Sequence, residues 1–145
     1  MNQFLRTLEV RWADLDPNFH LRHSVYYDYG ATSRIQLFQE LGITVEFMRE
    51  HSFGPIIFRE ECLFKKEIKL ADIVTIDVKL QKAKADFSRW TIQHTIYKNG
   101  NIICAYLTID GAWMDVIKRK LTTPPAEVIK TLDIIPRDGN FELVM

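Results

Sequence analysis

The sequence is poor in the features that mark secreted, membrane-spanning or metal-clustered proteins. Among its 145 residues are only two cysteines, Cys62 and Cys104, without C-x-x-C spacing. This pattern predicts buried, reduced thiols of a cytoplasmic protein and argues against a disulfide or a metal site. Residues 1–10 have no apolar segment typical of a signal peptide. No apolar run approaches the roughly 18 residues that a membrane helix needs, so no membrane contact is expected.

The sequence also lacks an excess of either charge. Nineteen basic and nineteen acidic side chains give a formal net charge of zero. Nothing in this balance favours nucleic acid as a partner, and weak repulsion between copies is compatible with self-association. The sequence has neither the G-x-S-x-G motif of a serine nucleophile nor a glycine-rich phosphate-binding loop, so no site of either kind is predicted.

The residues that are present fit one globular domain over residues 1–145. Hydrophobic residues make up 47% and charged residues 26% of the chain. These values are ordinary for a folded protein whose hydrophobic core needs no disulfides or metals for stability. Residues 133–145 are expected to form a loosely held tail.

Residues 24–42 have the period of a long amphipathic helix. Tyr27, Ile35 and Phe38 recur on one face, and the polar residues of the opposite face are Arg34, Gln36, Gln39 and Glu40. Gly30 inside this helix costs about 1 kcal/mol relative to alanine, which indicates close approach to a sheet or another backbone.

Most of the remaining chain is strand-like. The expected strands are residues 4–12, 55–66, 73–82, 87–97 and 102–114. Asn99-Gly100 between the last two is a strong hairpin signal. Shorter helices are expected over 44–51 and after Pro125. Sequential strands favour an α+β fold with an antiparallel sheet, one face of which the long helix covers.

The one candidate chemical centre is the segment 14–23, Asp-Leu-Asp-Pro-Asn-Phe-His-Leu-Arg-His. It lies just before the long helix, whose first amides are unsatisfied and whose dipole favours negative charge. Such a helix end can hold an oxyanion, and Asp16 can act as a nucleophile or as a base toward water. The alternative is an ordinary Asp-Pro-Asn turn in which Asp16 is a hydrogen-bond acceptor.

Two further alternatives concern the neighbours of Asp16. His20 and His23 have the spacing of a metal pair, but no third ligand follows, and no metal is expected. Asp14 is interpreted as a strand-end cap or an ion-pair partner.

Residues 10–26, VRWADLDPNFHLRHSVY, resemble the signature of hotdog-fold acyl-CoA thioesterases of the 4-hydroxybenzoyl-CoA thioesterase type. In that family an arginine-containing first strand leads into D-x-D-x-x-G-H-V-N-N-x-x-Y and then the long helix. The resemblance implies a hotdog fold, in which an antiparallel five-stranded sheet wraps around one central helix.

The resemblance also implies roles for individual residues. Asp16 falls on the catalytic carboxylate, Asn18 and His20 on positions that support the loop, and Tyr26 on the tyrosine at the helix start. Phe19 stands where glycine is usual, and Arg22-His23 replace two asparagines. Phe19 can disturb the oxyanion hole or narrow the acyl pocket.

Proteins of this family pair through the strand after the long helix, which is residues 55–66 here. Alternation places five residues on one face of this strand, and Glu60 is the only charged one: Ile56, Phe58, Glu60, Cys62 and Phe64. Glu60 is interpreted either as an ion-pair partner or as a second carboxylate lining the pocket, shared across a dimer. Lys118-Arg119-Lys120 is a solvated loop or a contact for the phosphates of coenzyme A.

The resemblance therefore implies an acyl-CoA or acyl-carrier thioesterase that forms a homodimer or homotetramer and needs no cofactor, because a thioester is already activated. Candidate site residues are Asp16 as the catalytic group, with Asn18, Phe19, His20, His23, Tyr26 and Glu60 around the substrate. Rival hypotheses are a non-catalytic acyl-thioester binding module, a hotdog dehydratase and a purely structural protein.

Overall fold

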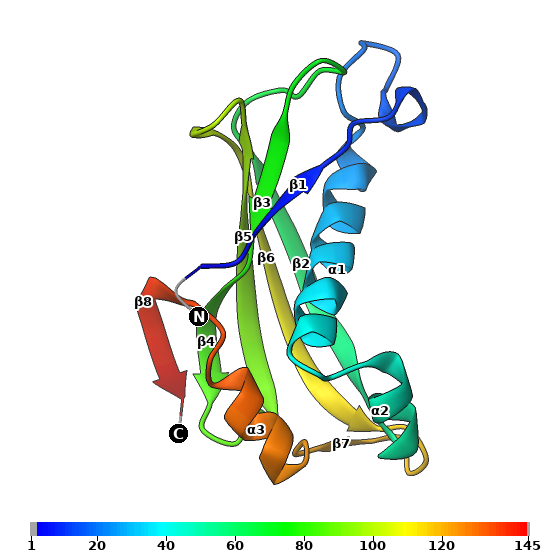
Figure 1. Cartoon of the computed structure of the whole chain (residues 1–145), viewed down its shortest axis with the longest axis vertical. Coiled ribbons are helices and arrows are strands. Elements are labelled where there is room, and N and C mark those ends of the chain that lie inside the picture. Colours follow the sequence, from blue (N-terminus) through cyan, green and yellow to red (C-terminus); the bar gives the residue numbers. More distant parts are fainter. Residues whose placement is uncertain (1–2, 145) are drawn as a thin grey trace.

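The computed structural model describes residues 3–144, which form one curved sheet with helix α1 packed along it (Figure 1). The elements in chain order are β1 (Leu5–Leu8), η1 (Trp12–Asp14), α1 (His23–Glu40), α2 (Val45–Glu50), β2 (Phe53–Phe64), β3 (Val74–Asp77), β4 (Lys79–Lys84), β5 (Arg89–Lys98), β6 (Ile102–Asp115), β7 (Lys120–Thr122), α3 (Ala126–Leu132) and β8 (Arg137–Val144). None of the helices in this part of the chain is long and apolar enough to cross a membrane.

Among residues 3–144 all strand pairs of the sheet are antiparallel except β4 with β8. β1 pairs with β3, β3 and β4 with β5, β5 with β6, and β6 with β2 and β7. β3 and β4 are separated by Val78 alone, so they act as one interrupted strand. The predicted α+β class and the antiparallel sheet around one long helix are confirmed. The sheet also contains two strands that the sequence did not predict: the short β7, and β8, which is parallel to β4.

The C-terminal region differs from the expected loosely held tail. Residues 137–144 form β8, whose register pairs Lys82 with Glu142 and Ala83 with Leu143. Ile135, just before β8, is 2% exposed and belongs to the main hydrophobic core. The burial of this one apolar side chain brings the following residues to the free edge of β4, where backbone groups need partners.

Helix α1 lies unusually close to the sheet at Gly30. A Cβ atom on Gly30 would be 2.3 Å from Leu107 Cδ2, 3.1 Å from Arg34 Nη1 and 3.3 Å from His94 Cδ2. Leu107 and His94 are both fully buried in the sheet. The expectation that Gly30 permits close approach of the helix to a sheet is confirmed.

Arg34 lies on the buried side of α1, which corrects its assignment to the polar face. Its side chain is 5% exposed, and its Nη1 lies 3.0 Å from Nε2 of His94. A guanidinium has no acceptor, so His94 Nε2 accepts this bond and Nδ1–H donates to the Asp77 carbonyl oxygen at 2.8 Å. Burial, with a contribution from Arg34, lowers the pKa of His94 to about 3, so the ring is neutral.

Strand β2 contains a bulge that alters which of its side chains share a face. The register with β6 shifts between Ile57 and Arg59, so Phe58 has no directly opposed partner. Phe58 instead lies under the guanidinium of Arg89, 5.0 Å from its ring centroid. The expected apolar row is therefore interrupted, since an inserted residue reverses the alternation of a strand.

Substitution of Gly30 tests the helix–sheet contact. Gly30→Ala adds a methyl group against buried side chains, and the overlap outweighs the gain in helix propensity. We expect the free energy of unfolding to fall by about 1–2 kcal/mol, measured by urea denaturation. Thr32→Ala, at an exposed position of the same helix, is the control and should change stability by less than about 0.5 kcal/mol. A more stable Gly30→Ala protein would contradict the close approach.

Candidate active site

The segment before α1 is held in place by Asp14. Its carboxylate accepts from Arg11 Nη2 at 2.7 Å and from Arg11 Nε at 3.1 Å, and its carbonyl oxygen accepts from the amide of Arg22 at 2.7 Å. The bidentate hydrogen bond from Arg11 holds the pKa of this buried carboxyl below its usual range. Asp14 thus has the ion-pair role that the sequence favours, and it ties the two ends of the segment together.

Asp16 is half-buried and uses only one of its two carboxylate oxygens to build the turn. Its Oδ1 accepts from the amide of Asn18 at 2.9 Å and from the amide of His20 at 3.1 Å. Among residues 3–144 no hydrogen-bond donor engages Oδ2. The turn interpretation and the chemical interpretation of Asp16 are therefore compatible, because the same carboxylate anchors the loop through one oxygen and keeps the other free.

A cavity of about 290 Å³ opens beside Asp16. Three segments of the chain line it: the loop before α1, the first turn of α1, and the end of β2 with the residues that follow. The lining residues are Asp16, His20, Leu21, His23, Tyr26, Phe64, Lys65, Lys66 and Glu67. Asp16, His20, His23 and Tyr26, which the sequence proposes for a site, thus share one cavity.

His20 is fixed by the segment after β2. Its Nε2 lies 2.8 Å from Glu67 Oε2, and the amide of the next residue, Leu21, donates to the Ile68 carbonyl oxygen at 2.7 Å. Lys69 Nζ lies 3.5 Å from the other oxygen of Glu67. These contacts couple the wall of the cavity to residues that are more than forty positions later in the chain.

Tyr26 and Phe64 form the apolar side of the cavity. Their rings meet edge to face, with centroids 4.9 Å apart. Tyr26 is 3% exposed, and burial raises the pKa of its hydroxyl above the ordinary value. An aromatic pair beside a carboxylate provides a surface for an apolar acyl or aryl group.

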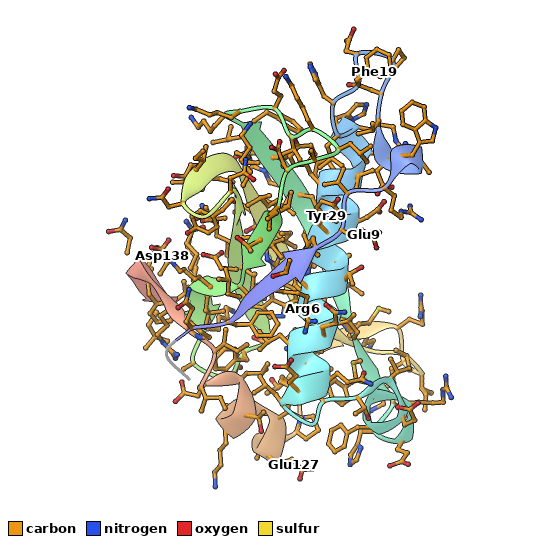
Figure 2. The ribbon with its side chains drawn as sticks, turned by 45° about the horizontal axis from the view of Figure 1, so that its top comes forward. Arg6, Glu9, Phe19, Tyr29, Glu127 and Asp138 are labelled. Carbon is orange, nitrogen blue, oxygen red and sulfur yellow. The ribbon has the colours of Figure 1, made fainter. Side chains whose placement is uncertain are left out.

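Asn18 and Phe19 do not line the cavity of the single chain. Asn18 contributes its backbone amide to Asp16 and has an exposed side chain. Phe19 is 65% exposed, at the outer tip of the loop in Figure 2. Its φ of 65° lies in the left-handed region that favours glycine. The backbone therefore adopts a conformation that glycine tolerates more easily than phenylalanine, and the ring does not line this cavity.

Glu60 lies elsewhere on β2, away from the Asp16 cavity. It is exposed, and it makes no ion pair with any residue in the described part of the chain. Its charge is close enough to Arg34 to oppose the lowering of the Arg34 pKa by burial. Within the single chain Glu60 thus relates to the buried arginine of α1, and its role as a second pocket carboxylate shared across a dimer stays a prediction.

The first turn of α1, which contains the cavity-lining residues His23 and Tyr26, begins with backbone donors that the helix does not use. The amide of Arg22 donates to Asp14 and that of Val25 to the Arg22 carbonyl oxygen. The amides of His23 and Ser24 have no partner among residues 3–144. Together with the helix dipole, these two N–H groups could stabilise an oxygen that becomes negative.

Five lining residues were not proposed from the sequence: Leu21, which lies within the segment 14–23, and Phe64, Lys65, Lys66 and Glu67, which lie far from it in the chain. The latter four follow one another in a stretch that looks like the end of a strand and a solvated loop. Their position could have been predicted only from the order of the elements, because β2 runs back along α1 and ends beside the N-terminus of that helix (Figure 1). No group of three His, Cys, Asp or Glu side chains that could hold a metal ion occurs among the described residues.

The unusual backbone at Phe19 predicts a contrast between two substitutions. Phe19→Gly removes an exposed ring and relieves the left-handed strain, so stability should stay unchanged or rise by up to about 1 kcal/mol. Phe19→Val places a β-branched residue at the same φ and should lower stability by about 1 kcal/mol. Thermal unfolding of both variants measures the difference, and equal stabilities would exclude the left-handed conformation.

Solved structures similar to this one include named thioesterases. A hypothetical protein of Staphylococcus aureus, solved in complex with CoA, has a TM-score of 0.86 and 14% identity, covering 99% of this chain and 89% of the other. A 1,4-dihydroxy-2-naphthoyl-CoA thioesterase from Synechocystis has a TM-score of 0.80 and 12% identity, covering 92% and 97%. A gentisyl-coenzyme A thioesterase has a TM-score of 0.75 and 22% identity, covering 86% and 98%. The TM-scores show a shared fold, and at identities this low the likeness extends to the fold alone.

Family membership comes from the sequence itself. No curated protein matches this sequence. Residues 10–132, which include the loop before α1, the cavity and most of the sheet, match the family described as the thioesterase-like superfamily. This protein therefore has a hotdog fold and belongs to the thioesterase-like superfamily.

Proposed function

We propose that this protein hydrolyses the thioester of an acyl-CoA or acyl-carrier substrate to a free acid and a thiol. The observation that carries this proposal is the half-buried carboxylate of Asp16 beside a cavity: its Oδ1 accepts from two amides, and its Oδ2 has no donor among residues 3–144. Membership of the thioesterase-like superfamily supports it. The motif over residues 10–26 favours the 4-hydroxybenzoyl-CoA thioesterase type within that superfamily.

In this proposal Asp16 acts in one of two ways. As a general base, it takes a proton from water while the water oxygen bonds to the thioester carbon. As a nucleophile, Oδ2 bonds to that carbon and forms a mixed anhydride, which water then hydrolyses. In both routes the C–S bond breaks, and the sulfur leaves as a thiolate that acquires a proton. A thioester is activated enough that neither route requires a metal or a redox cofactor.

The amides of His23 and Ser24 would hold the carbonyl oxygen while it carries negative charge. They belong to a helix of eighteen residues, so the helix dipole adds to their effect. Tyr26 and Phe64 would pack against the acyl group. His20, held by Glu67, would keep the wall of the cavity in position.

The decisive prediction concerns Asp16→Asn. The asparagine side-chain oxygen can still accept the two amide hydrogen bonds, so the loop should keep its shape, but no carboxylate remains to attack or to take a proton. We expect kcat to fall by about a hundredfold to ten-thousandfold. Thiol release from short, long, aliphatic and aromatic acyl-CoA esters measures this rate. Aromatic esters are included because two similar structures are named as a 1,4-dihydroxy-2-naphthoyl-CoA thioesterase and a gentisyl-coenzyme A thioesterase.

Asp28→Asn is the matched control, because Asp28 is an exposed carboxylate on α1 outside the cavity. It should retain wild-type turnover. Retained turnover in Asp16→Asn would remove Asp16 from the reaction. Wild-type protein that binds acyl-CoA without hydrolysing any ester would support the alternative of a binding module.

We further propose that two copies pair through β2. In the described part of the chain β2 pairs with β6 alone, which leaves a long free edge. Ile57, Phe58, Leu63 and Phe64 along it are 45%, 53%, 50% and 52% exposed. A long apolar edge strand is a template for pairing with another chain, and Phe64 would bring that contact to the cavity.

Lysine substitutions on this strand test the pairing. Ile57→Lys and Leu63→Lys should shift a dimer or tetramer toward monomer, because each places a charge in the proposed contact. Leu143→Lys is the control, since Leu143 on β8 is 54% exposed but lies at the other edge of the sheet. Light scattering at micromolar concentration reports the mass. A monomeric wild-type protein would remove the proposal of a shared site.

A further inference from the structure

Arg22 is the residue at which the Asp16 loop joins α1, and its side chain closes the base of that loop. Its Nη1 donates to the Ala13 carbonyl oxygen at 3.0 Å, and its Nε donates to Ser24 Oγ at 2.9 Å. Ala13 and Ser24 are the residues directly before and after the segment 14–23. One guanidinium therefore ties together the two ends of the candidate segment.

The backbone of Arg22 adds to this closure. Its amide donates to the Asp14 carbonyl oxygen at 2.7 Å, and its carbonyl oxygen accepts from the amide of Val25 at 3.0 Å. Arg22 thus contacts η1 before the loop and the first turn of α1 after it. Because a guanidinium is a rigid planar group, its two side-chain hydrogen bonds fix the relative positions of their acceptors, which the single ammonium group of a lysine would not do.

The parts that Arg22 connects are those on which the proposed hydrolysis depends. The loop holds Asp16, and the first turn of α1 holds the amides of His23 and Ser24, which would stabilise the thioester oxygen. A displacement of about 1 Å between such groups can lower a rate by about a hundredfold. We infer that Arg22 is a positioning residue, which holds Asp16 and the helix amides in the relative position that the reaction needs. This inference rests on the proposed hydrolysis.

The charge of Arg22 supports a functional interpretation of this contact. A cation at the N-terminus of a helix is unfavourable, because the helix dipole already makes that end positive. The Asp14 carboxylate is bound to Arg11, and Arg22 forms no ion pair with any residue between 3 and 144. A neutral hydrogen-bonding residue would suit the helix better, whereas a positive charge beside the free amides favours an oxygen that becomes negative.

Arg22→Gln tests the inference with two readouts. Glutamine has no charge and can replace at most one of the two side-chain hydrogen bonds. Amide hydrogen exchange, which needs no turnover, should become about fivefold faster or more in residues 14–24, because the loop is no longer closed at its base. For the acyl-CoA ester that the wild type hydrolyses fastest, kcat should fall by about ten- to hundredfold at nearly unchanged KM, since the clamp acts on the transition state.

Two further variants complete the experiment. Arg49→Gln, at an exposed position on α2 outside the cavity, is the control for loss of one arginine and should match the wild type in both readouts. Arg22→Lys keeps the charge without the planar fork, so it should also exchange faster and turn over more slowly. The urea midpoint of the Arg22 variants should move by less than about 0.5 M, so that loss of folded protein does not explain a lower kcat.

The outcomes separate this inference from the proposed hydrolysis. Unchanged exchange in residues 14–24, or a wild-type kcat per folded molecule in both Arg22 variants, would overturn the inference. A higher KM at unchanged kcat would also overturn it and make Arg22 a substrate contact. If exchange is faster in the variants but even the wild type hydrolyses no ester, the closure of the loop by Arg22 stands and the proposed hydrolysis fails.

Discussion

The close packing of α1 against the sheet at Gly30 is the constraint on which the candidate site depends. With no side chain at that position, the helix backbone approaches Leu107, and the Arg34 guanidinium reaches His94 across the gap. This contact fixes the height and direction of the helix over β5 and β6. Because α1 and β2 run side by side (Figure 1), the same contact brings the first turn of α1 to the end of β2, where the cavity forms.

The loop before α1 shows how structural and chemical roles can share one carboxylate. Asp14 is buried and fully committed to Arg11, so it closes the loop but has no free oxygen at the cavity. Asp16 accepts two amide hydrogen bonds through Oδ1 alone. Those two bonds orient the carboxylate and offset part of the cost of holding it half-buried, while Oδ2 has no donor among residues 3–144.

Charge is distributed unevenly although its sum is zero. Arg34 is buried against a neutral histidine, and burial lowers its pKa to about 10, against the opposing effect of Glu60. At the end of β2, by contrast, two lysines and two carboxylates line one cavity: Lys65, Lys66, Asp16 and Glu67. The proposed pairing of two chains along the free edge of β2 therefore lies next to this cavity.

The sequence by itself determined the local structure: the long helix, the Asn99-Gly100 hairpin with both residues at positive φ, and the turn around Asp16. Periodicity and turn chemistry act over a few residues, so they can be read from the chain. Tertiary structure decided the rest. The burial of Arg34, the bulge in β2, and the placing of Phe64 to Glu67 beside Asp16 depend on contacts between distant segments, which no local pattern encodes.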